Sequence, residues 1–249
     1  MGKLIILTGP SCVGKGPLIE AMHKFYPQII SKMNKLVIYN SRWPRPGEKE
    51  GLDYFFRQRS DIERLQNQQD FVTCDVRGDL QAIDLNQLKQ LLKQGDVFFE
   101  GNPLILELLF EKLQPEKIKT LKTFLSPLSR EEIEYFKNLK PAVSLSSLIT
   151  DMMRRKLLRR TQRQKGILSQ QDLDDIERRA TSAFGEMKYA GRCDAVIPNQ
   201  DGEDSENWNA FYYPVGCARK TMECFAMLLK GQFCPPAETW PKELLDGVE

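Results

Sequence analysis

A glycine-rich turn near the start of the chain stands between an apolar run and a segment with helical spacing. The apolar run, residues 4–7, predicts a buried strand, and residues 17–25 predict a helix with Pro17 in its first turn. The turn, Gly9-Pro10-Ser11-Cys12-Val13-Gly14-Lys15, fits the pattern G-x-x-x-x-G-K. Such glycines let backbone N–H groups surround a phosphate, while the helix N-terminus and the lysine add positive charge. We therefore predict a phosphate loop that binds ATP through Gly9, Ser11, Cys12, Val13, Gly14, Lys15 and Gly16.

Gly16 is a departure from the usual loop, because a hydroxyl normally follows the lysine and ligates Mg²⁺. Pro17 also removes an N–H that could face a phosphate. Water and phosphate oxygens could still hold the ion. We therefore expect ATP and Mg²⁺ as cofactors, with no direct metal ligand from the protein.

The rest of the chain alternates between strand and helix patterns. Strands are expected at residues 35–39, 96–100, 120–125 and 195–199, and helices at 60–65, 85–92, 103–113, 151–165, 172–188 and 215–229. Ser60, with Glu63 three residues on, is the expected cap of its helix. This alternation predicts one α/β domain with a parallel sheet flanked by helices.

Composition excludes several kinds of chemistry. The 36 basic and 34 acidic side chains give a net charge of +2, and His23, expected at or near the surface, is the single histidine. One histidine excludes a histidine-rich zinc site and would have to serve alone in any Ser-His or Cys-His pair. The six cysteines form no CxxC pair, so reduced thiols are expected. No window suits a membrane helix and the start is too short for a signal peptide, so we expect a cytoplasmic protein.

Residues 41–56 read SRWPRPGEKEGLDYFF, which places Arg42 and Arg45 in a proline-stiffened loop that suits an anion. Together with the phosphate loop, this stretch resembles the guanylate kinase signature S/T-R-x-P-R-x-G-E-x-x-G-x-D-Y-x-F. The resemblance implies a P-loop NTPase fold with acceptor-binding and lid excursions, and nucleotides as substrates. It also implies that Arg42, Arg45 and Tyr54 hold the phosphate of the acceptor.

The base-reading positions depart from the family pattern. Where the family has a guanine-contacting Glu, the second tyrosine of a turn and a hydroxyl, this chain has Thr73, Gln81 and Ile83. After the strand that ends in Glu100, the acidic base-reading position of the family falls at Asn102. The resemblance implies that Thr73, Gln81, Glu100 and Asn102 line the acceptor site, and Asp75 or Asp79 could replace the missing carboxylate.

Residues 154–165 carry seven basic and no acidic side chains. Alone, such a run favours a solvated face or a nucleic-acid patch. Behind a phosphate loop, it resembles the lid of the family, which implies that Arg159, Arg163 and Arg179 act on the transferred phosphoryl group. The resemblance also places Asn199 on the adenine side.

The resemblance covers residues 3–125 and 155–200. We expect a single domain over 1–249, with a core at 1–34 and 96–150, an acceptor-binding region at 35–95, a lid at 151–190, and a core strand with a C-terminal helical extension at 191–249. The acidic stretch Asp201-Gly202-Glu203-Asp204 is either a solvated loop or a contact for metal or substrate, and Arg77-Gly78-Asp79 reads as a turn.

Three hypotheses remain. The first is an ATP-dependent nucleoside monophosphate kinase acting on GMP or dGMP, or on another phosphorylated acceptor. The second is a catalytically silent guanylate kinase-like interaction module, because Gly16 and the base-reading positions depart from the family. The third, a nucleic-acid binder, is weaker because the net charge is only +2. The sequence does not indicate an oligomeric state.

Overall fold

The computed structural model describes residues 1–45, 47–113 and 118–246. Pro46, in the predicted acceptor loop, lies outside the described residues, as does the end of the predicted domain at 247–249. The chain divides into two compact units, Met1–Leu7 with Lys32–Leu121, and Thr8–Ser31 with Lys122–Glu249. Within the described ranges, no helix combines the length and hydropathy needed to cross a membrane.

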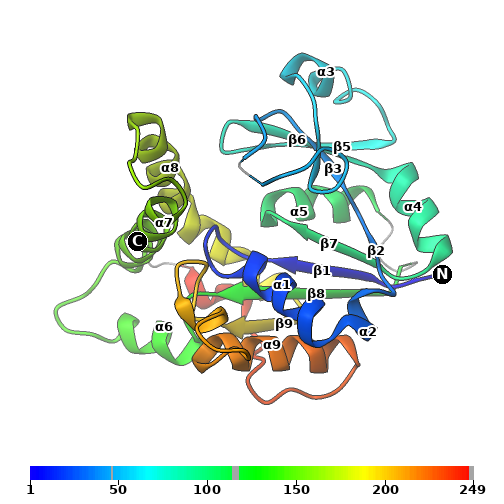
Figure 1. The fold of residues 1–249 in the computed structure, drawn as a ribbon. Helices are drawn as coiled ribbons and strands as arrows, with labels where there is room; N and C mark the ends of the chain where they lie inside the picture. The colour runs from blue at the N-terminus through cyan, green and yellow to red at the C-terminus, as the bar shows by residue number, and fades with distance from the viewer. Residues whose placement is uncertain (46, 114–117, 247–249) are drawn as a thin grey trace. The chain divides into compact units, whose positions relative to one another are not determined.

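A five-stranded sheet has the strand order β2-β7-β1-β8-β9 (Figure 1). The pairs β2–β7 and β8–β9 are parallel, which confirms the predicted α/β fold with a parallel sheet. In the first unit, Leu4 N donates to Lys119 O, and Val97 N donates to Lys3 O. The strands are β1 (Leu4–Thr8), β2 (Asn34–Lys35), β7 (Val97–Gly101), β8 (Thr120–Ser126) and β9 (Ala195–Pro198).

The first unit contains a second sheet that the sequence did not predict. Its order is β4-β3-β6-β5, with β3–β4 parallel and β3–β6 and β5–β6 antiparallel. The prediction of one strand over residues 35–39 is therefore wrong, because the chain leaves one sheet after Lys35 and enters the other at Ile38. The strands are β3 (Ile38–Asn40), β4 (Tyr54–Phe56), β5 (Phe71–Val76) and β6 (Asp79–Asp84).

Three helices complete this unit: α3 (Arg59–Glu63), α4 (Leu85–Gln94) and α5 (Pro103–Lys112). All three were predicted, but Ser60 is not a cap, because α3 begins one residue earlier and follows Gln58 without a side-chain cap. Between β5 and β6, Arg77 and Gly78 both have positive φ, which confirms the predicted turn. The larger core of the unit combines Leu4, Ile6, Val97 and Phe99 with side chains of α4 and α5.

The second unit is mainly helical around β8 and β9. The helices α7 and α8 pack against each other, and α9 contacts α1 and β9 (Figure 1). A stripe on α7 at four-residue spacing, Ile149, Met153, Leu157 and Thr161, is buried. The helices are α1 (Lys15–Phe25), α2 (Pro27–Ile30), α6 (Arg130–Lys137), α7 (Leu145–Lys165), α8 (Gln170–Met187) and α9 (Gly216–Leu229). Short 3₁₀ helices are η2 (Lys188–Arg192), η3 (Glu206–Trp208) and η4 (Lys242–Leu245).

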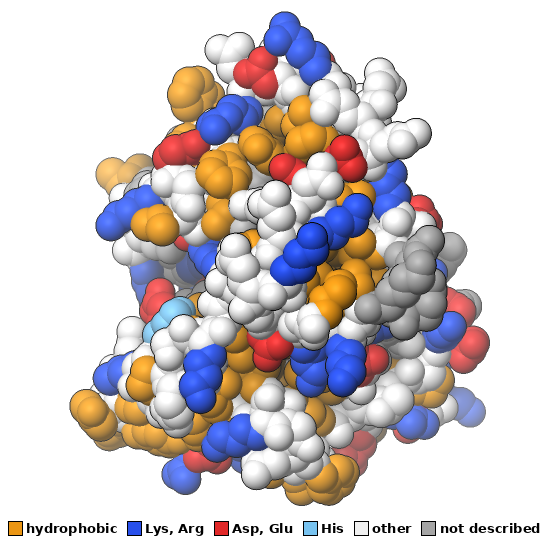
Figure 2. Space-filling model, turned by 90° about the vertical axis from the view of Figure 1, so that its right-hand side faces the viewer, with side chains coloured by type: hydrophobic (Ala, Val, Ile, Leu, Met, Phe, Trp, Pro, Cys, Tyr) orange, Lys and Arg blue, Asp and Glu red, His pale blue; other side chains and the backbone are white. Residues whose placement is uncertain are grey.

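One pair of cysteines contradicts the expectation of reduced thiols. Cys224 of α9 and Cys234 form a disulfide, while Cys12, Cys74, Cys193 and Cys217 are free thiols. The pair escaped sequence analysis because a helix end and a following loop, and no CxxC spacing, bring the two residues together. On the face in Figure 2, basic side chains are interspersed with acidic and hydrophobic ones.

Candidate functional site

The phosphate loop is formed by backbone that only glycine tolerates easily. Gly9 and Gly14 have φ of 142° and 104°. A Cβ at Gly9 would lie 2.4 Å from Leu125 O, and one at Gly14 would lie 2.5 Å from Asn199 Nδ2. Gly14 precedes α1 without a side-chain cap, so no side chain competes for the first N–H groups of that helix. This arrangement is suited to an anion.

Lys15 is nearly buried and turns back into the loop. Its Nζ donates to Gly9 O at 2.8 Å and to Pro10 O at 2.9 Å. The ammonium group is thus held within the loop whose backbone amides surround a phosphate in this motif. A Cβ at the next residue, Gly16, would meet no atom within 4 Å, so packing does not exclude a larger residue there.

Asn199 links the end of β9 to the phosphate loop. Its side chain is fully buried, and Nδ2 donates to Val13 O at 2.7 Å and to Asp201 O at 2.8 Å. Cys12, also buried, has a φ of 65°, and burial raises the pKa of its thiol to about 12. A neutral thiol of this kind is a weak nucleophile, so Cys12 serves the loop through its backbone.

The predicted lid arginines of α7 differ in exposure. The Arg159 side chain is 65% exposed and its Nη1 lies 3.3 Å from Asp204 Oδ2, while half-exposed Arg163 lies 3.4 Å from Glu206. Arg160 is 15% exposed and contacts Glu203 Oε2 at 2.7 Å. The backbone N of Glu203 in turn donates to Cys12 O, so Arg160, which the resemblance did not select, is connected to the phosphate loop through Glu203.

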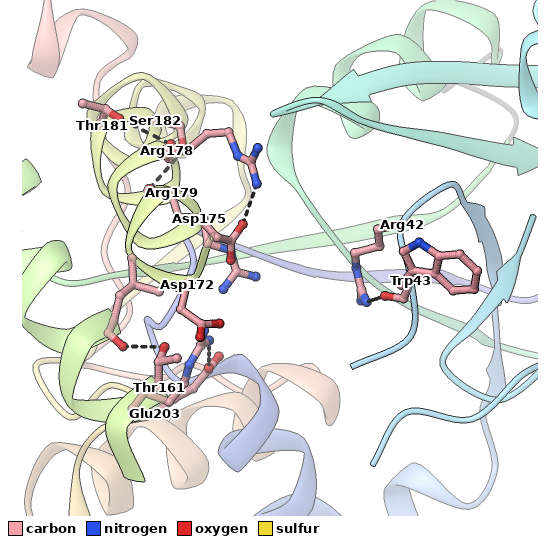
Figure 3. A network of polar contacts seen from close by, with 12 residues as sticks. Arg42, Trp43, Thr161, Asp172, Asp175, Arg178, Arg179, Thr181, Ser182 and Glu203 are labelled. Carbon is pink, nitrogen blue, oxygen red and sulfur yellow. Dashed lines mark hydrogen bonds and ion pairs between the residues drawn. The ribbon is translucent and has the colours of Figure 1, made fainter. Parts of the chain in front are cut away.

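Arg179 of α8 is buried, and its Nε lies 3.4 Å from Asp175 Oδ2 (Figure 3). Its neighbour Arg178 also contacts Asp175, at 2.8 Å, but is half exposed. Arg179 affects the pKa of Glu203, which places both residues in one electrostatic cluster.

The acidic stretch that follows β9 is no solvated loop. Asp201 accepts hydrogen bonds from Ser205 Oγ, Asn207 Nδ2 and the backbone N of Ala218. Asp204 is buried. The stretch is therefore a structured part of the second unit, anchored at Asp201.

In the first unit, Arg42 is fixed by an acid and two aromatic rings. Its Nη1 and Nη2 each contact a different Glu48 oxygen at 2.6 Å, and its Nη1 also donates to Trp43 O (Figure 3). The guanidinium carbon lies 5.0 Å from the Tyr54 ring centroid and 5.6 Å from that of Phe56. Arg45 is exposed, and its backbone N donates to Glu48 Oε2 at 2.8 Å. The structure thus brings together Arg42, Arg45 and Tyr54 through Glu48, which the sequence signature contained but the prediction did not use.

The end of β7 contributes two further predicted residues. Burial raises the pKa of the Tyr54 hydroxyl, and Glu100 raises it further, so Glu100 lies within electrostatic reach of Tyr54. Asn102 caps α5, because its Oδ1 accepts a hydrogen bond from Leu104 N at 2.9 Å. Capping accounts for an asparagine here without any contact to a base.

Two predicted base-reading residues lie on opposite faces of the second sheet. Cross-strand partners share a face. Gln81 pairs with Asn40 and Cys74, and Cys74 packs with Tyr54 against the larger core. Thr73 pairs with Ala82, which packs with Ile62 in a separate cluster. The structure therefore places Cys74, and not Thr73, on the Gln81 face.

The described ranges contain no group of three or more His, Cys, Asp or Glu side chains that could hold a metal ion. Sequence reasoning did not select Arg160, and it named Glu203 only as part of the acidic stretch 201–204. The stripe of buried residues on α7 was a usable signal, because Arg160 follows Leu157 by three residues and so lies beside that stripe. Glu203 carried no such signal.

Comparison with known proteins links both units to one family. A protein-family model for guanylate kinase matches residues 1–133. The guanylate kinase of Synechococcus sp. (strain JA-3-3Ab) is 32% identical over 136 residues, which are 53% of this chain and 58% of that protein. The guanylate kinase of Aromatoleum aromaticum is 29% identical over 204 residues, which are 80% of this chain and 81% of that protein.

The fold is also similar to that in the crystal structure of guanylate kinase from Anaplasma phagocytophilum. The TM-score is 0.55 at 18% identity, and the match covers 98% of this chain and 94% of that one. At this identity the likeness shows a shared P-loop fold.

Proposed function

The chain belongs to the guanylate kinase family of nucleoside monophosphate kinases, and we propose that it transfers the γ-phosphoryl group of ATP to GMP or dGMP. The observation that carries this proposal is the phosphate loop, in which Lys15 sits among loop carbonyls at the start of α1. In phosphoryl transfer the protein mainly positions the two substrates and offsets their charge.

The donor site would use the backbone of Gly9, Ser11, Cys12, Val13, Gly14 and Gly16, with Lys15 and Asn199. The fit to ATP is supported by the two glycines whose φ is positive and by the uncapped N-terminus of α1. Among the lid residues, Arg159, Arg163 and Arg179 remain proposed contacts of the transferred group. Mg²⁺ would be held by phosphate oxygens and water, because Gly16 offers no side-chain oxygen. When bound, that ion offsets charge on the β- and γ-phosphates.

On the acceptor side, Arg42, Arg45 and Tyr54 would hold the monophosphate. The two arginines would offset the repulsion between two anionic nucleotides. Gln81, Glu100 and Asn102 are the proposed surroundings of the base, while Thr73 lies on the opposite face of the second sheet. Glu100 is the carboxylate near Tyr54, so it is the strongest acceptor of guanine N–H groups in this set.

The distribution of side chains on the two faces of the second sheet favours a second candidate, an acceptor with a base other than guanine. The polar side chains on the Gln81 face include the amide of Asn40, while Thr73 lies on the other face. An amide presents donors as well as an acceptor, whereas a carboxylate only accepts. A base other than guanine would therefore suit this face. The catalytically silent interaction module is the other alternative, because Gly16 lacks the hydroxyl that usually ligates Mg²⁺.

ADP production from ATP and Mg²⁺, measured with GMP, dGMP, AMP, CMP and UMP in turn, tests the proposal. We expect turnover with GMP or dGMP and its loss in Arg42→Ala, mainly through a higher KM for the acceptor. The matched control is Arg57→Ala, because Arg57 pairs with exposed Glu50 and lies over Tyr39 and Phe55, which share the other face. Turnover with another nucleotide alone would point to a different acceptor. Silence with all five, despite ATP binding, would favour the interaction module.

A further inference from the structure

We propose that Glu203, in the C-terminal extension, is a positioning residue that holds Arg160 for the phosphates of the donor nucleotide. This inference rests on the ATP site of the proposed function. It gives the extension, which lies beyond the part of the chain that resembled the family in sequence, a direct role at that site. All of the residues involved belong to the second unit.

The segment that carries Glu203 is fixed by its own hydrogen bonds. The Asp201 carboxylate binds the side chains of Ser205 and Asn207 and the backbone of α9 at Ala218. The indole nitrogen of Trp208 donates to Asp201 O at 2.8 Å and to Gly202 O at 3.1 Å. Glu203 therefore projects from a rigid turn, which is what a positioning residue requires.

The same segment lies against the phosphate loop. Glu203 N donates to Cys12 O at 3.2 Å, so the two backbones are joined directly. A Cβ at Gly202 would lie 2.3 Å from Cys12 O, so only glycine allows this approach. Trp208 also lies against the loop, because its Cζ2 would be 3.2 Å from a Cβ at Gly14. A substitution in this segment would therefore act directly on the phosphate loop.

Glu203 forms an ion pair with the Arg160 guanidinium. Its Oε2 lies 2.7 Å from Arg160 Nη1, and the two side chains are only 21% and 15% exposed. Burial raises the pKa of Glu203, but Arg160 and Lys15 outweigh this effect and lower it, so the carboxylate is ionised and lies near both cations. Such a contact fixes the direction of a guanidinium whose five donors form a rigid fork.

One hydrogen-bond donor of Arg160 is unpaired. Its Nε is buried and has no hydrogen-bond partner among the described residues. A buried unpaired N–H is unfavourable, and an anion that accepts from it would relieve this cost. Arg160 lies near the phosphate loop, because the backbone N of its partner Glu203 donates to Cys12 O. The unpaired Nε therefore suits a phosphate oxygen, while Glu203 holds Arg160 through Nη1.

The remaining acids of the segment do not form a metal site. Asp204 lies 3.3 Å from Arg159 and 3.7 Å from Lys156, and Glu206 lies 3.4 Å from Arg163. Each of these carboxylates thus pairs with a basic side chain of α7. The main competitor is self-inhibition, in which Glu203 would neutralise Lys15 and Arg160 and oppose nucleotide binding. Self-inhibition predicts that Glu203→Gln binds ATP more tightly than wild type.

The test is the dissociation constant of ATP, measured by isothermal titration calorimetry on the full chain, for wild type, Glu203→Gln, Arg160→Ala and the double variant. We expect Glu203→Gln to weaken ATP binding by about tenfold, the size expected for a hydrogen bond between charged groups. In the Arg160→Ala background, Glu203→Gln should then have no further effect. A merely structural role would persist in that background. The matched control is Glu177→Gln, because Glu177 pairs with Arg154 of the same helix α7 at 2.6 Å.

Thermal unfolding checks that each variant is folded, and Glu203→Gln keeps the shape of the side chain. Unchanged ATP affinity in Glu203→Gln, a tighter complex as self-inhibition predicts, or an equal loss in Glu177→Gln would overturn the inference. Wild type that binds ATP but transfers no phosphoryl group would refute the proposed function while the comparison of affinities still decides the role of Glu203. Wild type that does not bind ATP would overturn both.

Discussion

Arg42 makes two hydrogen bonds with Glu48 and lies over two aromatic rings, so its direction is set before an acceptor arrives. A long side chain that is already ordered loses less conformational freedom when it binds an anion. Burial raises the pKa of Glu48, but the contacts with Arg42 and with the backbone of Arg45 outweigh burial and lower it. The carboxylate is thus ionised, and it supports both arginines of the predicted clamp.

Glu48→Gln should therefore weaken acceptor binding without touching the donor site. The variant removes the charge that orients Arg42 and leaves a half-buried cation with a neutral partner. We expect the KM for the acceptor to rise about tenfold and the KM for ATP to stay unchanged. Steady-state kinetics with each substrate varied in turn measure both. The control is Glu50→Gln, because Glu50 pairs with half-exposed Arg57 at 2.7 Å. Equal effects of the two variants would show that Glu48 has no special role.

Arg159 and Arg160 show what residue-level prediction can and cannot deliver. A basic run behind a phosphate loop predicted that arginines of this helix serve the site. The choice between neighbours depends on helix phase, because successive residues point about 100° apart. The buried stripe at Ile149, Met153 and Leu157 fixes that phase. Glu203 could not be found in the same way, because its place depends on how a loop after β9 folds over Cys12.

At the scale of elements, the β5–β6 hairpin decides which residues can face an acceptor. A strand alternates its side chains, so a change of one residue in register exchanges the two faces. The sequence placed Thr73 at the position of the guanine-contacting acid, but the register puts Cys74 beside Gln81. A resemblance transfers positions along the chain, whereas the turn at Arg77 and Gly78 sets the register.

Apolar runs were the most reliable signals for elements. Residues 4–7 and 96–100 predicted β1 and β7 because the buried part of each strand is apolar on both faces. The strands β3 and β4 are only three residues long, so no period could reveal them. The sheet that carries Tyr54 and Gln81 was consequently missed, although its residues were named.

The start of α8 provides a prediction about pH. Ser169 and Asp172 form a capping box, and Lys165 also contacts Asp172. The hydrogen bond from Lys165, and then those from Ser169, lower the pKa of Asp172 to about 2. Because the unfolded value is about 3.9, ionised Asp172 stabilises the fold above pH 4, and this contribution is lost as the pH falls toward 2. Asp172→Asn should lower the melting temperature at pH 7 and flatten its fall between pH 4 and 2.

Thermal unfolding at a series of pH values measures this difference. Asp174→Asn is the control on the same helix, because Asp174 accepts one hydrogen bond, from Gln170 Nε2 at 2.9 Å. Parallel curves for wild type and Asp172→Asn would show that the capping contacts do not contribute to stability.

On the scale of the whole molecule, the net charge of +2 hides strong local charge. In the second unit, Lys15 and the basic residues of α7 lie with the carboxylates of Glu203, Asp204 and Glu206. In the first unit, Arg42 and Arg45 share Glu48. Transfer between two nucleotides depends on cations and backbone amides, which is consistent with a chain that has one histidine. Each unit thus has its own cluster of paired basic and acidic side chains.

The most direct test of phosphoryl transfer is GMP-dependent ADP formation by wild type and by Lys15→Met, which keeps a long side chain without its charge. Wild type should turn over, and Lys15→Met should lose about 10²–10³-fold in kcat, because the cation acts on charge that develops during transfer. The melting temperature of the variant should show that it is folded. A wild type that forms no ADP with any nucleoside monophosphate, or a Lys15→Met protein as active as wild type, would contradict phosphoryl transfer at this loop.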